Sequence, residues 1–190
     1  MATYSASITA STDDADQASG TVDLTGTTIN VNGTGQYAGL RFTNVTIPNA
    51  ATINTATLDV EIVSTTHDDP DLTIYGEATD DAATFAGTSN NISGRTPTTA
   101  TTVWTATSIG TGVKTSPSIV SIIQEIINRP GWVSGNDIAI LMNGRSGASF
   151  FRIRTINAGS GSPATLNIDY TAGGGSSQPP RSMHQFRQRR

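Results

Sequence analysis

The sequence predicts an all-β protein, a two-sheet antiparallel sandwich of the jelly-roll kind with one short helix. Three observations lead to this expectation. Several segments alternate apolar and polar residues with a period of two, as residues 56–62 do. Only 14% of the 190 residues are charged, so threonine, serine and asparagine must supply most of the polar surface. A single segment, residues 116–130, has the apolar spacing of a helix.

Nine segments are candidate strands, each bounded by turn residues. Residues 56–62 show the clearest alternation, and residues 151–154 and 166–170 repeat it. Residues 137–142 are more uniformly apolar, which favours a central strand that is covered on both faces. The weaker candidates are residues 4–8, 27–31, 39–43, 72–76 and 101–105.

The helix is expected over residues 117–128. Its isoleucines recur at spacings of three and four, which forms one apolar stripe of Ile119, Ile122, Ile123, Ile126 and Ile127. Thr115 or Ser116 is expected to be the N-cap, with Pro117 in the first turn. Pro130 and Gly131 should end the helix. We expect the stripe to close one open end of the sandwich.

The charges divide the chain into a body and a tail. Residues 1–172, the predicted sandwich domain, carry 7 basic and 15 acidic side chains, a net formal charge of −8. Residues 173–190 begin with a Gly/Ser/Pro-rich linker and carry four arginines and no acid. An acidic body with a basic tail suggests two different interaction surfaces.

The tail is a candidate partner-binding segment. Arginine binds phosphates or carboxylates, and an aromatic ring can anchor a segment, so the candidate residues are Arg181, Phe186, Arg187, Arg189 and Arg190. We do not expect a nucleic-acid partner, because the acidic body would repel a duplex. A solubilising end is one alternative, and the favoured one is an arm that orders on a neighbouring subunit.

Composition excludes several classes of protein. The chain has no cysteine, so disulfides and thiolate metal sites are excluded. The first residues have neither the basic nor the apolar region of a secretory signal, and the longest apolar run is too short for a membrane span. We therefore expect a chain that is made and kept soluble, without a membrane partner.

Three stretches resemble a known family. They are residues 39–58, residues 122–140 with the helix exit Asn-Arg-Pro-Gly-Trp, and residues 163–170 with Pro-Ala-Thr-Leu-Asn-Ile-Asp-Tyr. Together they resemble the carbohydrate-binding-module-like jelly rolls that often carry a DNRLRE motif, found in phage virion proteins and bacterial extracellular modules. The motif itself is absent here. The resemblance spans roughly residues 2–171 and implies a fold more than a function.

Acidic loops are the candidate metal sites. Calcium prefers several carboxylate and carbonyl oxygens in a flexible loop, and jelly rolls of this resemblance sometimes hold such an ion. The candidate ligands are Asp68, Asp69 and Asp71, and the alternative is an ordinary solvated turn. Two further acidic loops, one with Asp13, Asp14 and Asp16 and one with Asp80 and Asp81, have the same two interpretations. We expect no other cofactor.

Tryptophans are the candidate sugar-stacking residues. A ring face of Trp104 or Trp132 could pack on a pyranose, although core packing is the favoured alternative for both. We predict no catalytic residues, because the sequence has no nucleophile–base motif. The carboxylates all fall in expected loops or on outward strand faces, without the apolar neighbours that would raise a pKa.

These features favour a non-catalytic structural virion protein of a phage, either a capsid decoration protein or a tail-fibre or tail-tip component. Such a protein is made in the host cytoplasm, needs no disulfide and is released by lysis. Its expected partners are identical copies and other virion proteins, and a host surface glycan is a further candidate. The alternative is a carbohydrate-binding module of an extracellular protein.

Overall fold

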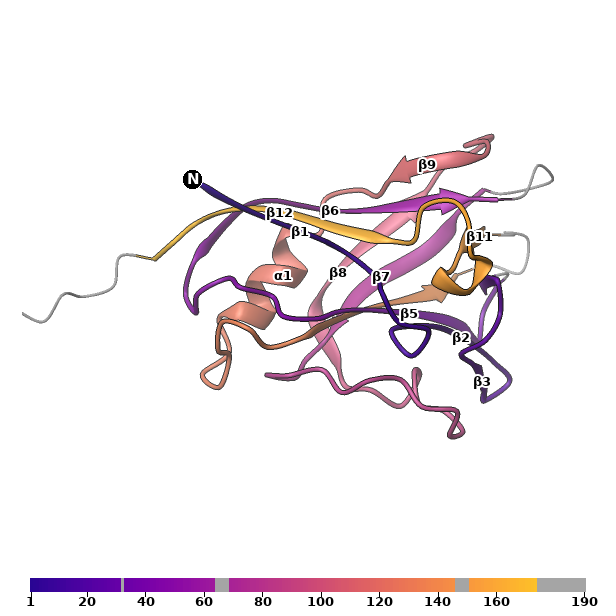
Figure 1. The fold of residues 1–190 in the computed structure, drawn as a ribbon, viewed down its shortest axis with the longest axis horizontal. Helices are drawn as coiled ribbons and strands as arrows, with labels where there is room; N and C mark the ends of the chain where they lie inside the picture. The colour runs from indigo at the N-terminus through magenta and orange to yellow at the C-terminus, as the bar shows by residue number, and fades with distance from the viewer. Residues whose placement is uncertain (32, 64–68, 146–150, 174–190) are drawn as a thin grey trace, which may run out of the picture.

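Two antiparallel sheets of six strands each face one another in the computed structural model (Figure 1). The structure describes residues 1–31, 33–63, 69–145 and 151–173. The first sheet has the order β1-β12-β6-β11-β4, with β9 also paired to β6, and the second has the order β3-β2-β5-β10-β7-β8. The predicted all-β, two-sheet antiparallel sandwich with one helix is confirmed.

All nine predicted strands are present. The first sheet consists of β1 (Ala2–Ser7), β4 (Thr28–Val31), β6 (Thr52–Ile62), β9 (Gly112–Thr115), β11 (Phe151–Arg154) and β12 (Thr165–Thr171). The second consists of β2 (Asp14–Ala18), β3 (Thr21–Asp23), β5 (Gln36–Phe42), β7 (Asp71–Glu77), β8 (Pro97–Thr105) and β10 (Ile138–Gly144). The sequence did not reveal β2, β3 and β9, because these strands are short and β2 is largely polar on both faces.

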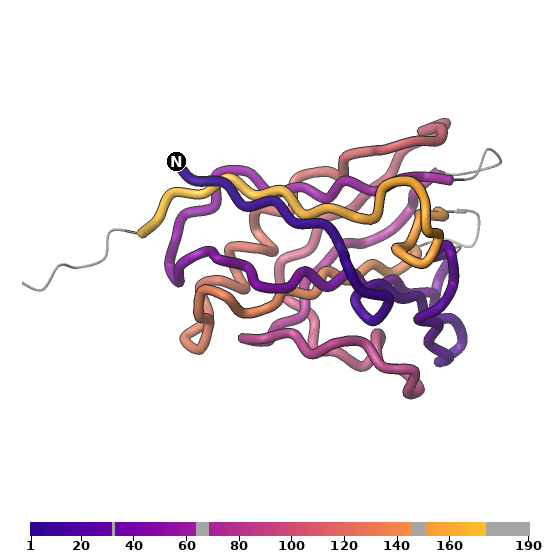
Figure 2. Tube along the Cα trace, viewed as in Figure 1, coloured from indigo at the N-terminus to yellow at the C-terminus, as the bar shows by residue number. Residues whose placement is uncertain are grey.

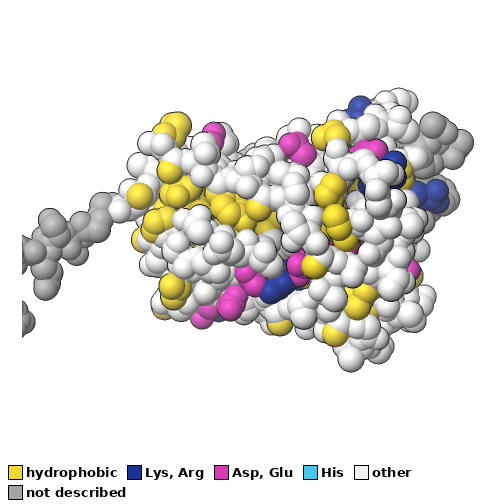
Figure 3. All heavy atoms as spheres, viewed as in Figure 1, with side chains coloured by type: hydrophobic (Ala, Val, Ile, Leu, Met, Phe, Trp, Pro, Cys, Tyr) yellow, Lys and Arg dark blue, Asp and Glu magenta, His cyan; other side chains and the backbone are white. Residues whose placement is uncertain are grey.

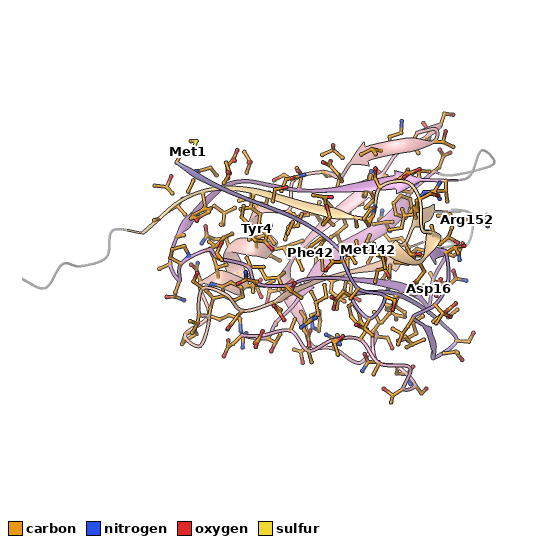
Figure 4. All side chains as sticks on the ribbon, in the orientation of Figure 1. Met1, Tyr4, Asp16, Phe42, Met142 and Arg152 are labelled. Atoms are coloured by element: carbon orange, nitrogen blue, oxygen red, sulfur yellow. The ribbon has the colours of Figure 1, made fainter. Side chains whose placement is uncertain are left out.

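The main core lies between the sheets. Alternate residues of β6 enter it, as the period of two predicts, and β10 is buried on both faces, as its uniform apolar run predicts. Ile138, Ile140 and Met142 join the main core, whereas Ala139 and Leu141 point to the outer side of the second sheet. Figure 4 shows Phe42 and Met142 between the two sheets.

A second, smaller core covers part of the outer face of the second sheet. The loop of residues 78–96, which runs below that sheet in Figure 2, packs Phe85 and Ile92 against Ala15 and Leu141. Gly39 of β5 lies directly under the Phe85 ring, and a Cβ atom there would be 2.4 Å from Phe85 Cζ. The loop is therefore built into the fold as a third layer over part of this sheet.

The helix is shorter than predicted. It spans α1 (Val120–Ile127), and its predicted apolar stripe is fully buried. The predicted N-cap is wrong, since Ile119 occupies that position and no side chain caps the helix. Ser116 instead extends the pairing along the edge of β6, where its Oγ accepts a hydrogen bond from the backbone N–H of Leu58 at 3.0 Å. Pro117, predicted in the first turn, precedes the helix.

Two side chains of α1 hydrogen-bond to backbone groups of β6 and β8 that have no neighbouring strand to pair with. Gln124 bonds to the β6 edge twice, donating to the carbonyl of Ala51 and accepting from the backbone N–H of Ile53, each at 2.9 Å. The Glu125 carboxylate accepts from two backbone N–H groups of β8, those of Thr99 at 2.8 Å and Ala100 at 2.7 Å. The helix thus joins an edge of each sheet and closes the space between them.

Replacing Gln124 with alanine is expected to lower the free energy of unfolding by about 2 kcal/mol, because both backbone groups that it serves would lose their partner. Ser121 lies on the exposed side of the same helix, so Ser121→Ala is the matched control and should change stability by less than about 0.5 kcal/mol. Urea unfolding of both variants measures the difference. Equal stability of the two variants would show that Gln124 does not hold the sheet edge.

No helix in the described part of the chain is long and apolar enough to cross a membrane. The described residues end at Gly173, so the proposed boundary between the body and the tail lies at their limit.

Candidate functional site

A largely buried charged cluster ties loops to the second sheet. Arg41 of β5 forms ion pairs with Asp13 at 2.5 Å and with Asp137, and its Nε donates to the carbonyl of Ala82 at 2.7 Å. These partners come from the β1–β2 turn, the start of β10 and the loop of residues 78–96, which we call the covering loop. The cluster therefore fixes three segments that are distant in sequence, and one guanidinium is shared by two carboxylates.

Arg95 does the same inside the covering loop. Its Nη1 pairs with Glu77 at 2.6 Å and donates to the carbonyl of Ala83 at 2.8 Å, while its guanidinium lies 4.4 Å from the centre of the Phe85 ring. A depression of about 460 Å³ opens beside this pair and is lined mostly by residues 88–96. Its charged lining residues, Arg95 and Glu77, are already paired, so it presents no free charge to a ligand.

Every acidic side chain within the described residues has at least one protein partner, although the buried Oδ1 of Asp14 has none. Of the 15 in the sequence only Asp68 lies outside these residues, which leaves 14. Six pair with arginine: Asp13, Glu61, Asp71, Glu77, Asp80 and Asp137. The other eight accept hydrogen bonds from backbone or side-chain donors: Asp14, Asp16, Asp23, Asp59, Asp69, Asp81, Glu125 and Asp169. The carboxylates thus serve the packing of strands and loops.

Two of the three predicted calcium ligands, Asp69 and Asp71, lie within the described residues. Asp69 accepts a hydrogen bond from the backbone N–H of Ser108, and Asp71 pairs with Arg145 at 2.9 Å. Asp68 lies outside the described residues. Over the described ranges no group of three or more acidic or histidine side chains is arranged to hold a metal ion. The other two acidic loops are engaged in the same way, through Asp13 with Arg41 and Asp80 with Arg129.

The expectation of ordinary carboxyl pKa values is wrong at β2. Asp14 and Asp16 belong to this strand and not to a loop, and they point across to the first sheet. Asp14 is 2% exposed, and this burial raises its pKa to about 6, although its Oδ2 accepts from the backbone N–H of Ile156 at 2.8 Å. Burial also raises the pKa of Asp16, whose Oδ2 accepts from the backbone N–H of Asn30 at 3.0 Å. Figure 4 shows Asp16 at the end of the sandwich, near Arg152.

Both tryptophans belong to the core, so the glycan-stacking role suggested for Trp104 and Trp132 is corrected. Trp104 is 3% exposed and meets the Phe151 ring edge-on, with 5.2 Å between ring centres. Trp132 is 2% exposed, and its Nε1 donates to the carbonyl of Ile47 at 2.9 Å. The packing alternative describes both, and neither ring has a face available to a sugar.

The four tyrosines, unlike the two tryptophans, are partly exposed, and they lie on two separate surfaces. Figure 3 shows apolar side chains along the open side of the sandwich, and Figure 4 places Tyr4 there. The Tyr4 hydroxyl donates to the carbonyl of Thr43 at 3.1 Å, and that of Tyr170 donates to the carbonyl of Thr46 at 3.4 Å. Burial, with the Asp137 charge, raises the pKa of Tyr4 to about 12. These two tyrosines fasten the segment after β5 to the first sheet.

The other surface is the outer face of the second sheet, where Tyr37 and Tyr75 pack partly against the Phe85 cluster. Sequence reasoning missed this pair. The alternation in Leu72-Thr-Ile-Tyr75 did contain the signal for Tyr75, because Leu72 and Ile74 are core residues and Tyr75 must then face outward. Its proximity to Tyr37 depends on the pairing of β5 and β7 with β10, which the sequence does not contain.

The five predicted tail residues, Arg181, Phe186, Arg187, Arg189 and Arg190, lie outside the described residues, and their role stays a prediction. No protein-family model matches the chain, and no curated protein matches it either.

Proposed function

We propose that this chain is a non-catalytic structural protein of a phage virion, either a capsid decoration protein or a tail-fibre or tail-tip component. The observation that carries the proposal is the use of the charged groups. All 14 described carboxylates are held by arginines or other internal donors, which is how a rigid building block uses them. A general acid or base must instead reach a substrate.

The outer face of the first sheet supports the same role. Neighbouring polar side chains there hydrogen-bond to one another, as Ser5 does with Asn167 at 2.7 Å and Asn167 with Asp59 at 2.8 Å. Thr55 bonds to Asp169 on the next strand at 3.0 Å. Such cross-strand pairs stabilise a sheet and leave a surface of small polar groups, which suits a domain exposed on a particle.

Immunoelectron microscopy tests the location. Antibodies against residues 1–173 are expected to label virions in a regular array or at the tail tip. Finding the protein only outside particles, in the medium of the producing cells, would instead favour the alternative, a carbohydrate-binding module of an extracellular protein.

The tail supplies a second test. The body carries a net charge of −8 and the tail +4, so we propose that the tail arginines bind the acidic body of a neighbouring copy. Deleting residues 174–190 should leave the melting temperature within about 2 °C of the full chain and weaken self-association severalfold at low salt, where screening is least.

Replacing the four tail arginines with glutamine is the matched control, because it keeps the length and removes the charge. It should reproduce the deletion in sedimentation velocity between low and high salt. Self-association that is unchanged in both variants at every salt concentration would show that the tail is a passive end.

A further inference from the structure

The edges of the two sheets are protected in different ways. A free strand edge presents unpaired backbone groups to other chains, so proteins shorten it, cover it, or place charges and prolines on it. In the described part of the chain, β3 and β9 have only three and four residues. Strand β4 also has four, and the backbone N–H of Asn30 in it donates to Asp16 at 3.0 Å. The nine-residue edge of β8 is covered by α1, whose Glu125 accepts from Thr99 and Ala100.

Strand β1 has none of these protections. It has six residues, Ala2–Ser7, with no charge and no proline, and its register with β12 has no bulge. It stands at the end of the first sheet, so β12 is its only strand neighbour among the described residues. Figure 1 shows β1 along the open side of the sandwich. A strand of this kind is a template for the addition of another strand.

The pairing with β12 determines which backbone groups of β1 are free. Residues of an antiparallel strand face their neighbour alternately, and just beyond β1 the N–H of Ile8 donates to the carbonyl of Ala164 at 3.0 Å. The even-numbered residues of β1 therefore bond to β12. The backbone N–H and C=O groups of Thr3, Ser5 and Ser7 point to the open edge, and no described residue bonds to them.

These outward groups are complementary to a second copy of β1. Antiparallel pairing needs an outward residue opposite an outward residue, and the longest overlap places Ser5 opposite Ser5 of the second copy, on a two-fold axis. Thr3 then lies opposite Ser7 of the second copy, and Ser7 opposite Thr3. Each pair exchanges two hydrogen bonds, about six in all. No side chain of β1 is charged, so the pairing brings no like charges together within the strand.

Two side chains on the inner side of β1 add apolar area to this contact. Tyr4 and Ala6 are half-buried, and a strand laid against β1 would cover part of their remaining surface on the open side that Figure 4 shows. We propose that the chain forms a two-fold dimer in which β1 pairs antiparallel with β1 of a second copy. The two first sheets then form one continuous sheet. The proposal goes beyond a location in a virion, because it concerns the full chain in solution.

Cysteine cross-linking tests the register of the dimer. The chain has no cysteine, so Ser5→Cys introduces a single thiol. Facing Cα atoms of a hydrogen-bonded pair are about 5.5 Å apart, which a disulfide spans. Oxidised glutathione should therefore convert the folded variant into a disulfide-linked dimer. Thr101→Cys is the matched control, because it places an exposed cysteine on the edge strand that α1 covers, and its dimer yield should be severalfold lower. Equal yields from the two variants would overturn the proposal.

Sedimentation velocity of the full chain tests the hydrogen bonds. In about 0.5 M sodium chloride, contacts of the tail arginines are screened and main-chain pairing is not. The parent should dimerise with a Kd of about 10 µM to 1 mM, as a small interface does. Ser5→Pro removes an outward N–H, which an edge strand tolerates, and should weaken dimerisation about tenfold or more. Ser5→Val is the matched control, because it loses the same hydroxyl contact with Asn167 and keeps the N–H, so it should dimerise as the parent does.

Circular dichroism checks that each variant is folded. If Ser5→Pro does not fold, Ser5→Lys makes the same test, because two like charges would face each other on the axis. A parent that shows no dimer at about 1 mM would overturn the proposal. A folded Ser5→Pro or Ser5→Lys variant that dimerises as the parent does would also overturn it, and would assign self-association to another surface, such as the tail.

Discussion

Replacing Arg41 with methionine is expected to lower the free energy of unfolding by about 3–5 kcal/mol. The guanidinium pairs with two carboxylates, Asp13 and Asp137, and Asp13 is only 5% exposed. Removing the arginine would leave these negative charges close together and one of them buried without its counter-charge. The carbonyl of Ala82 would also lose its donor, which should loosen the covering loop.

Arg145→Met is the control for this experiment, since it removes a pair of the same kind from an exposed position. It should cost less than about 1 kcal/mol. Adding Asp13→Asn to Arg41→Met should recover part of the lost stability, because it removes the stranded charge. Guanidinium unfolding measures all three variants, and a loss from Arg41→Met no larger than that from Arg145→Met would contradict the proposed role of the cluster.

Replacing Asp14 with asparagine is expected to stabilise the protein above neutral pH. Burial raises the pKa of Asp14 from 3.8 to about 6, so the folded protein holds this proton more tightly than the unfolded chain does. Its favourable contribution is therefore complete below pH 3.8 and is lost as the pH rises through about 6. At pH 8 the ionised carboxylate costs about 3 kcal/mol, which the neutral amide avoids.

The variant and the parent should accordingly be equally stable near pH 3.8, and the variant should be more stable by up to about 3 kcal/mol at pH 8. Asp23→Asn is a control of opposite sign, because the backbone N–H of Thr25 lowers the pKa of the exposed Asp23 carboxyl group. That carboxylate stabilises the protein above its unfolded pKa, and the effect is lost as the pH falls through its folded pKa. A difference between Asp14→Asn and the parent that is constant from pH 4 to pH 8 would refute the raised pKa.

The stability changes expected for Arg41→Met and Asp14→Asn share one cause. In both cases a charged side chain lies between the second sheet and a segment that packs against it. Arg41 lies beneath the loop of residues 78–96, and Asp14 lies between the second sheet and the segment that begins with the 3₁₀-helix η1 (Ile156–Ala158). At both places a carboxylate makes a contact that joins segments far apart in the chain.

Local patterns in the sequence were sufficient for the main elements. The period of two placed nine strands, and it assigned inner and outer faces in β6 and β12, because a side chain's direction in a strand depends only on its position. The isoleucine stripe of α1 was predicted for a similar reason, since spacing alone defines a helix face. Asn-Arg-Pro-Gly after the helix marked its end correctly.

Only the tertiary structure decided the properties that depend on strand pairing. The sequence of β2 reads as a polar turn, and its carboxylates become buried because β4 and η1 lie across them. The N-terminus of α1 begins late because Ser116 pairs with the edge of β6, a partner 58 residues away. Tyr37 and Tyr75 share a face because β10 lies between their strands. Hydrogen bonding between strands joins distant segments, so the sequence determined the nine predicted strands one by one, and the fold determined which side chains meet.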